Sequence, residues 1–250
     1  MDKLLRKIVK EKGDCVFVSP HLDDAILSCG SVLLNLKGKK DAVIINVFTR
    51  AHKGPYTVSA QKFLDSCGNY QDATKLYEKR IKEDKIVLSK LKVKIINLGL
   101  QDALFRRKKR LTLLGKFIPE LDHLYPTYRW HAIKSVSPKD WALSDLGDAL
   151  KKIVKSDAVV FAPLGIGNHA DHQIANKACQ KVFKKIVFYS DFPYSVYIKE
   201  NGLFTKKNYK KILKKTSVKK NELIKLYQSQ FSSLFPSGKI PQHEEVYYIK

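Results

Sequence analysis

Residues 14–25 read DCVFVSPHLDDA, an apolar run that ends in a histidine and two adjacent carboxylates. Residues 14–19 are typical of a buried strand, and AILSCGSVLLNL at 25–36 has the apolar spacing of a helix. Two like charges side by side repel each other, and neither helps a helix or a strand to form. The stretch is therefore either a solvated turn with a capping aspartate or a group of ligands for a cation.

The alternation of strand and helix continues along the chain. Short apolar runs alternate with segments of helical spacing, which predicts an α/β fold: a Rossmann-like, mainly parallel sheet with helices on both faces. There is no Pro-, Gly- or Ser-rich linker and no internal repeat, so we expect a single domain over residues 1–250. Residues 101–143 lack a clear period and predict a loop-like or helical excursion. The further predicted strands are 41–49, 94–100, 157–163 and 185–191, and the further predicted helices are 73–91, 144–155 and 171–184.

The composition is that of a globular chain without a membrane span. Hydrophobic residues make up 44% of the sequence, and no apolar run approaches the roughly 18 residues that a transmembrane helix needs. The start, MDKLLRKIVKEKGD, is too charged for a secretory signal. The four cysteines are scattered without a CxxC pair, which argues against a disulfide framework and a thiolate zinc site. We therefore expect a protein of the reducing cytoplasm.

The charge is strongly positive, because 47 lysines and arginines face 24 acidic residues, for a formal net charge of +23. Such a field attracts nucleic acid, anionic lipid head groups or acidic glycans, and it would steer an anionic substrate. Residues 206–225 hold nine lysines against one glutamate, and part of this segment is expected to be helical. Its simplest interpretation is a solvated face, with peripheral membrane contact as an alternative. Lysine in place of arginine, without interleaved exposed aromatics, argues against sequence-specific reading of nucleic acid.

A second polar cluster follows another predicted strand, where GIGNHADHQ carries His169, Asp171 and His172. Ligands of a doubly wound sheet bind beyond the carboxyl ends of its strands, so both clusters are expected at the same edge. A catalytic zinc takes three protein ligands, commonly histidine nitrogen and carboxylate oxygen, and keeps one position for water. His21 and Asp24 can converge on one cation, and His172 can add the third bond. Together the two clusters hold three of the seven histidines of the chain.

The remaining polar residues of the two clusters suit acid–base work. Asp23 would lie beside the metal and could take a proton from its water. His169 could stabilise an oxyanion or protonate a leaving group, and Asp171 could orient one of the histidines. As alternatives, the aspartates are helix caps and the histidines are polar loop residues.

Several motifs resemble one known family. PHLDDA resembles the PHPDDE signature of the PIG-L/LmbE family, zinc-dependent deacetylases of N-acetylglucosaminyl compounds, and HADH resembles that family's HPDH or HxDH element. KRIKEDKIVLSKLKVKIINLGLQDALFR is similar to the family's arginine–glutamate helix, the strand after it and an LGxxDA turn. FYSDFPYS and YQSQFSSLF resemble later segments of one bacterial branch. The resemblance therefore covers about residues 14–248.

The resemblance implies the Rossmann-like fold, and an enzyme that hydrolyses the N-acetyl group of an N-acetylated amino sugar or glycoconjugate to acetate and a free amine. It implies Zn²⁺ as the cofactor, with His21, Asp24 and His172 as its ligands. Nitrogen and oxygen donors also accept other divalent ions, so another divalent metal is an alternative.

The resemblance also implies roles for five further residues. Asp23 would be the general base that activates water. His169 would stabilise the tetrahedral oxyanion or act as general acid, tuned by Asp171. Arg80 and Asp102 match positions that in relatives lie near the polar groups of the substrate.

The sequence departs from the family pattern at three positions. Leu22 replaces the proline of the signature, and Ala25 replaces its acidic residue. Neither is a metal ligand or the base in the family pattern, although Ala25 removes a carboxylate from beside the ligands. Some members place a tyrosine that touches the transition state where this chain has Gly167, so another group would have to take that place or the oxyanion would rest on zinc and His169 alone.

Two rival functions follow from the same residues. One is a different metal-dependent hydrolysis, of another amide or of a phosphoester, although no bridging carboxylate for a second metal is apparent. The other is a basic polyanion-binding protein with a vestigial metal site, which would use residues 206–225 and RRKKR at 106–110. The complete acid–base set argues against a vestigial site.

Overall fold

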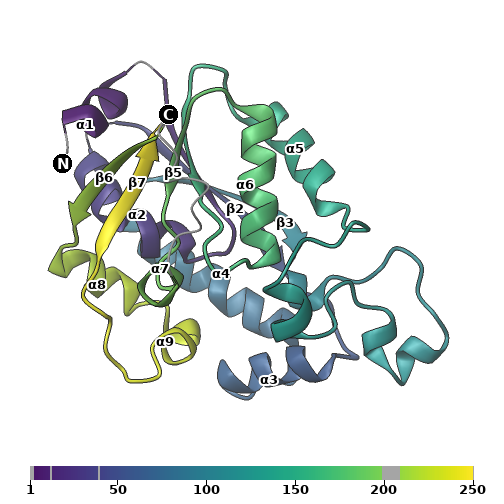
Figure 1. Ribbon diagram of the computed structural model, residues 1–250. Helices are drawn as coiled ribbons and strands as arrows, with labels where there is room; N and C mark the ends of the chain where they lie inside the picture. Colours follow the sequence, from purple (N-terminus) through teal and green to yellow (C-terminus); the bar gives the residue numbers. More distant parts are fainter. Residues whose placement is uncertain (1–2, 12, 39, 199–208, 250) are drawn as a thin grey trace.

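The computed structural model describes residues 3–11, 13–38, 40–198 and 209–249. Its centre is a seven-stranded sheet with the spatial order β3-β2-β1-β4-β5-β7-β6 (Figure 1). The strands are β1 (Cys15–Ser19), β2 (Ala42–Arg50), β3 (Lys94–Gln101), β4 (Val159–Pro163), β5 (Ile186–Tyr189), β6 (Lys210–Lys215) and β7 (Glu244–Ile249).

The first five strands are parallel, and β7 and β6 extend the sheet as an antiparallel edge. The chain proceeds outward from β1 to β3 and then places β4 on the other side of β1, so the strand order reverses between β1 and β4. This reversal is where a doubly wound sheet opens a crevice for ligands. The predicted α/β class with a mainly parallel sheet is confirmed, and the five predicted strands match the observed bounds within two residues.

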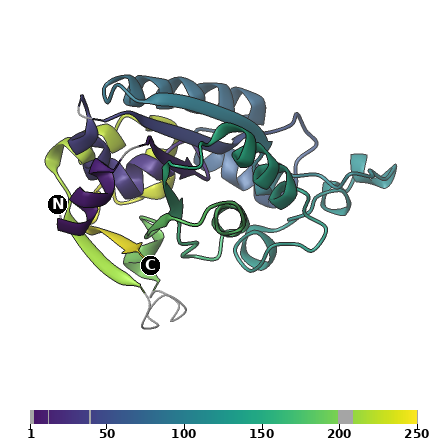
Figure 2. The ribbon, with the colours of Figure 1, turned by 90° about the horizontal axis from the view of Figure 1, so that it is seen from above.

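Helices cover both faces of the sheet (Figures 1 and 2). Apolar side chains of α1, α2, α4 and α8 pack on one face, and those of α5 and α6 pack on the other. The helices are α1 (Lys3–Lys10), α2 (Asp24–Leu36), α3 (Val58–Ser66), α4 (Ala73–Ser89), α5 (Ala142–Ile153), α6 (Ala170–Val182), α7 (Tyr194–Tyr197), α8 (Val218–Ile224) and α9 (Gln228–Leu234).

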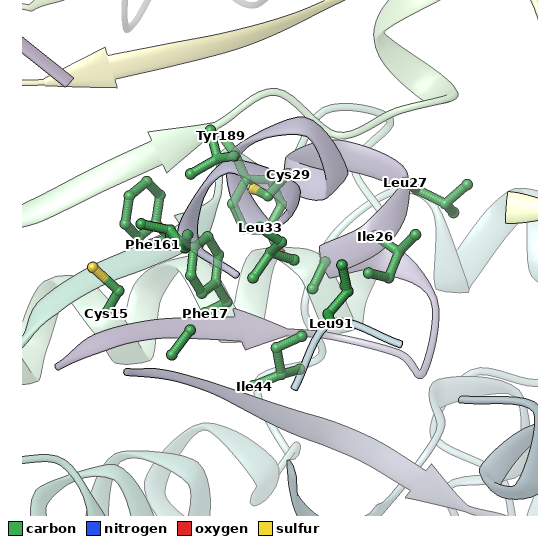
Figure 3. Close-up of a cluster of buried hydrophobic side chains, with 14 of the residues drawn as sticks. Cys15, Phe17, Ile26, Leu27, Cys29, Leu33, Ile44, Leu91, Phe161 and Tyr189 are labelled. Atoms are coloured by element: carbon green, nitrogen blue, oxygen red, sulfur yellow. The ribbon is translucent and has the colours of Figure 1, made fainter. Parts of the chain in front are cut away.

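The buried strand β1 divides its side chains between two hydrophobic clusters. Phe17 faces α2 and stacks on Phe161 of β4, with ring centroids 4.3 Å apart (Figure 3). Val16 and Val18 face the opposite side, beneath α5 and α6. Because successive side chains of a strand alternate between faces, a continuous apolar run is what a strand buried on both sides requires. Because β1 is held on both sides, the polar turn at residues 20–23, which follows it, is held at the end of the strand.

Residues between β3 and α5 form the predicted excursion, which consists of short turns and loops. The elements are η1 (Ala103–Phe105), η2 (Leu114–Lys116), η3 (Pro119–Leu121) and the π-helix η4 (Tyr128–Ala132). Its base packs with α3 and α4 in a third hydrophobic cluster that includes Leu104, Phe105 and Tyr125. The rest of the excursion projects beyond the sheet, in teal at the right of Figure 2.

The lysine-rich segment is helical only in part: α8 lies within it, as predicted, and the rest differs. Residues 210–215 form strand β6 and not a helix, because they pair with β7. Lys220 of α8 is fully buried, with Nζ 3.0 Å from Oε1 of Glu245, so the segment is not wholly a solvated face. Residues 206–208 of the segment lie outside the described residues. Among the described helices, none combines the length and apolar character that crossing a bilayer requires.

Candidate active site

The two polar clusters of the sequence meet at the reversal of the strand order. The segment that carries His21, Asp23 and Asp24 follows β1, and the segment that carries His169 and His172 follows β4, its neighbour in the sheet. All five side chains are buried. They lie at the carboxyl edge of the sheet, where the topology predicted a ligand site.

The aspartates do not cap the helices with their side chains. Asp23 occupies the N-cap of α2, but its carboxylate makes no capping hydrogen bond, and Ser19 Oγ accepts the Ala25 N–H instead. At α6 the cap is His169, whose Nδ1 accepts the Asp171 N–H at 3.3 Å. Because other groups cap both helices, the capping alternative does not account for these carboxylates.

The three predicted ligands form one compact cluster. Oδ2 of Asp24 lies 3.1 Å from Nδ1 of His21 and 3.4 Å from Nε2 of His172. Their donor atoms lie close enough together to hold a single metal ion. Nε2 of His172 is buried and, apart from this 3.4 Å approach to Asp24, meets no hydrogen-bonding partner within the described part of the chain. A buried acceptor of this kind is costly unless a proton donor or a cation meets it.

Each of the two imidazoles is held from behind by a carboxylate. Asp171 Oδ2 lies 3.2 Å from His21 Nε2, and Asp191 Oδ1 lies 2.6 Å from His172 Nδ1. Asp102 places a second carboxylate oxygen near Nε2 of His21, at 3.4 Å. Such partners set the tautomer and leave the opposite nitrogen free to bind a metal. Asp171 was predicted to orient a histidine or to tune His169, and the structure pairs its side chain with His21.

The carboxylates give the site a strongly negative field. Burial alone would lower the pKa of His21, but the Asp171 and Asp24 carboxylates outweigh burial and raise that pKa to about 9. Burial opposes ionisation of Asp24, yet His172 and His21 hold its pKa well below the usual value. A field that favours cationic imidazoles also favours a divalent cation at the same place.

Asp23 lies beside the ligand cluster and pairs with Arg80. Nη2 of Arg80 is 3.5 Å from Oδ1 of Asp23, and both groups are buried. Burial raises the pKa of Asp23, and the guanidinium opposes that rise. The predicted Arg80 and Asp102 both line the cavity, although Asp102 is already occupied by hydrogen bonds from Tyr77 Oη and the Leu104 N–H.

A cavity of about 570 Å³ opens above these residues. Tyr128 and Tyr194 line it, and Tyr194 packs with its ring edge-on to His172. Gly167 has a φ of +88°, and a Cβ there would lie 3.0 Å from the ring of Tyr194. Tyr194 therefore takes the space that a side chain at residue 167 would need. Further lining residues come from α2, α3, α9 and the chain after β5, and include Leu27, Lys62, Phe63, Tyr197, Gln230 and Leu234.

Two supporting residues were missed by sequence reasoning. Asp191 lies just after β5, and its Oδ2 accepts the N–H groups of Gly165 and Ile166 at 2.7 and 2.9 Å, so it supports both His172 and the loop before His169. Arg106 looked like part of a basic surface run, but it is fully buried between the carboxylates of Asp171 and Asp140. An aspartate at a third strand end was the available signal for Asp191.

The fold and the site together define a Rossmann-like α/β protein with a buried histidine–carboxylate cluster at its strand-order reversal. Residues 16–183 match the sequence model of the PIG-L family, described as GlcNAc-PI de-N-acetylase, and the chain belongs to this family. The predicted membership of this family is thereby confirmed. The 2'-N-acetylparomamine deacetylase of Niallia circulans is 26% identical over 203 residues, which span 74% of this chain and 69% of that protein.

Solved structures share the fold at low sequence identity. The zinc-inhibited form of teicoplanin deacetylase Orf2 superposes with a TM-score of 0.71 at 20% identity, and the match covers 95% of this chain and 98% of that one. The N,N'-diacetylchitobiose deacetylase from Pyrococcus horikoshii, in complex with its inhibitor MPG, gives a TM-score of 0.56 at 14% identity, over 98% and 86% of the two chains. These likenesses support the LmbE-like architecture.

Proposed function

We propose that this protein is a metal-dependent N-deacetylase that hydrolyses the N-acetyl group of an N-acetylated amino sugar or glycoconjugate. The observation that carries the proposal is the buried cluster of His21, Asp24 and His172, with Asp23 beside it at the floor of the cavity. Membership of the PIG-L family and the deacetylase relatives support the reaction class. The products would be acetate and a free amine.

The donor set fits a divalent cation, and we propose Zn²⁺. Two imidazole nitrogens and one carboxylate oxygen match a catalytic zinc site that keeps a position for water. Nε2 of His172, which faces Asp24 and makes no hydrogen bond within the described residues, and the carboxylates behind both imidazoles support this fit. A bound cation would polarise the acetamide carbonyl and lower the pKa of water. The likeness to a deacetylase described in a zinc-inhibited form supports binding of a divalent ion, and another such ion is the alternative.

Asp23 would act as general base. Its carboxylate is adjacent to the ligand Asp24 but does not cap α2, so it is available to accept a proton. Burial raises its pKa, which makes it a stronger base than an exposed aspartate, while Arg80 keeps an opposite charge nearby. Arg80 would thus position the base as well as line the cavity.

His169 would serve as a hydrogen-bond donor to the developing oxyanion. Its Nδ1 accepts the Asp171 N–H, so in the neutral ring the proton must sit on Nε2. The ring lines the cavity, which lets this N–H donate to a substrate oxygen there. The hydrogen-bond pattern favours this role over that of general acid, which would need a protonated ring.

The test separates metal binding from chemistry. His172→Ala should lose the bound metal, whereas Asp23→Asn should keep it and lose about a hundredfold or more in turnover. Asp148→Asn on the exposed face of α5 is the matched control and should change neither. Metal content is measured per chain after reconstitution, and acetate and free amine are measured on a panel of N-acetylated sugars that includes N-acetylglucosamine conjugates and 2'-N-acetylparomamine. Near-normal turnover in Asp23→Asn, or unchanged metal in His172→Ala, would refute the assigned roles. Phosphate release without amine release would favour the phosphoester alternative.

A further inference from the structure

Residues 108–122 form a closed loop that projects from the excursion. At its neck the Lys108 N–H donates to the Asp122 carbonyl at 2.7 Å, and Lys108 Nζ donates to the Leu121 carbonyl at 2.6 Å. Just outside the neck, Arg107 and His123 form an antiparallel bridge. A loop of this size with its ends in contact is an Ω-loop, a type of element that frequently carries function.

The interior of this Ω-loop is polar. Oδ1 of Asp122 accepts hydrogen bonds from the N–H and the hydroxyl of Thr112, each at 2.9 Å. Gly115 is buried against the same carboxylate, which leaves no room for a side chain: a Cβ there would lie 1.8 Å from Oδ2. Because Asp122 fills the inside, the apolar side chains of the loop have no interior to enter.

The exterior of the Ω-loop is correspondingly apolar. Of sixteen exposed large hydrophobic side chains among the described residues, six lie between Leu111 and Leu121. Leu113 is 84% exposed and Phe117 is 83% exposed, values that leave these side chains almost wholly in water. The other four are Leu111, Leu114, Ile118 and Leu121. Six exposed large apolar side chains within eleven residues indicate a binding surface.

We propose that the Ω-loop of residues 108–122 docks this protein onto an anionic lipid bilayer, with its leucines and Phe117 inserted among the acyl chains. Charge complementarity selects this partner. Residues 107–134 carry seven basic side chains and two acidic ones. Both acidic side chains are engaged: Glu120 accepts the Val58 N–H, and Asp122 is bonded inside the loop. Basic residues around inserted apolar ones bind anionic head groups while the apolar ones partition into the interface.

The same features disfavour other occupants. A second copy of this chain would bring an equally basic surface against this one, at a net charge of +23 on each. Single-stranded nucleic acid is held by aromatic side chains that stack on bases, whereas five of the six apolar residues here are aliphatic. Protein interfaces are depleted in lysine at their centres, and Lys116 lies between Leu114 and Phe117.

The docking surface is connected to the rim of the cavity. Glu120 of the Ω-loop bonds to the first turn of α3, and the next residue of that helix, Ser59, lines the cavity. Ser59 Oγ also accepts the N–H of Tyr128, another lining residue, at 3.1 Å. The rim of the cavity is therefore attached to the element that would meet the membrane.

Binding of the full-length protein to vesicles tests the proposal. The wild type should bind vesicles of phosphatidylcholine with phosphatidylglycerol more tightly than phosphatidylcholine alone. The double variant Leu113→Ser with Phe117→Ser should lower the partition coefficient at least about tenfold, because two apolar side chains no longer enter the interface. Both side chains are exposed, so thermal unfolding should be unchanged. In Phe117→Trp, the fluorescence of the new indole should shift to the blue when vesicles are added.

Two matched controls separate this surface from the rest of the molecule. Val218→Ser removes a similarly exposed apolar side chain from α8 and should leave vesicle binding unchanged. Lys215→Glu with Lys219→Glu, in the lysine-rich segment, should weaken binding less than Lys109→Glu with Lys116→Glu in the Ω-loop. No binding of the wild type to anionic vesicles, or binding that the Leu113→Ser with Phe117→Ser variant retains in full, would overturn the proposal. Loss of nucleic-acid binding in that variant with vesicle binding intact would overturn it in favour of a nucleic-acid surface. None of these readouts depends on catalysis.

Discussion

Replacing Asp191 by asparagine should weaken metal binding without disturbing the fold. Two backbone N–H groups, those of Gly165 and Ile166, donate to Oδ2 of Asp191. In Asp191→Asn these two N–H groups require the amide oxygen of the asparagine to face the loop, so its NH₂ group must face His172. In the native protein, Oδ1 of Asp191 lies 2.6 Å from Nδ1 of His172. The imidazole can then accept this hydrogen bond only by moving its proton to Nε2, the nitrogen that faces Asp24 and would bind the metal.

The size of the effect follows from this change of tautomer. Loss of a hydrogen-bonded partner behind a metal-binding histidine costs about 10–100-fold in metal affinity, or about 1.4–2.7 kcal/mol. The hydrogen bonds to the loop survive, so the free energy of unfolding of the metal-free protein should change by less than about 1 kcal/mol. Asp191→Ala should differ, because it leaves the buried N–H of Ile166 and the half-buried N–H of Gly165 without an acceptor, at about 1–3 kcal/mol for a buried group.

Competition with a chromophoric chelator gives the zinc affinity, and chemical unfolding of the metal-free protein gives the stability. Asp148→Asn is again the control for a surface carboxylate. Asp191→Asn with the zinc affinity of the wild type would refute the role of Asp191 in setting the tautomer of His172. Equal losses of stability in Asp191→Asn and Asp191→Ala would show that the residue only holds the loop.

Two further predictions concern buried ionisable groups away from the ligands. Burial raises the pKa of Asp84 to about 7, so below about pH 7 this group is mostly protonated in the folded state, while in the unfolded chain it ionises near its ordinary value. Unfolding then releases a proton, and stability should fall by up to about 4 kcal/mol as the pH rises from about 4 to 7. Asp84→Asn should flatten that part of the profile, measured by urea unfolding across the range, and an identical profile in the variant would contradict the assignment. Glu245→Gln should lower the free energy of unfolding by about 3 kcal/mol, because it leaves Lys220 buried without its counterion. A loss below about 1 kcal/mol, measured in the same way, would mean that Lys220 is already neutral in the folded protein.

The elements that place the site could be predicted because their signals are local. The apolar runs before His21 and before GIGNHADH identify β1 and β4 by themselves, and the topology then requires their carboxyl ends to meet. In β6 the local signal fails: of its six residues only Ile212 is fully buried, and the pairing with β7 that makes it a strand joins residues far apart in sequence. Propensity cannot anticipate such tertiary pairing.

The burial of Arg106 could not be predicted, for a related reason. A charge run such as RRKKR is usually solvated, and nothing local distinguishes Arg106 from its four neighbours. Its burial depends on two carboxylates, Asp140 and Asp171, that only the folded chain brings to it. Sequence reasoning therefore brings out the polar side chains at the two strand ends, Asp171 among them, whereas the role of Arg106 in holding Asp171 emerges from the structure.

Arg106 also connects the two proposals. Its guanidinium holds Asp171, and Asp171 in turn holds both His21 and the Ala103 N–H at the base of the excursion. The Ω-loop begins two residues after Arg106. An Ω-loop that inserts into a bilayer is subject to forces that could displace the chain on which it stands. Here Arg106, at the entry to the Ω-loop, is fixed by its buried ion pair and by the aromatic rings of Phe48 and Tyr125. The Ω-loop can therefore contact a membrane while the same buried groups hold His21 in position.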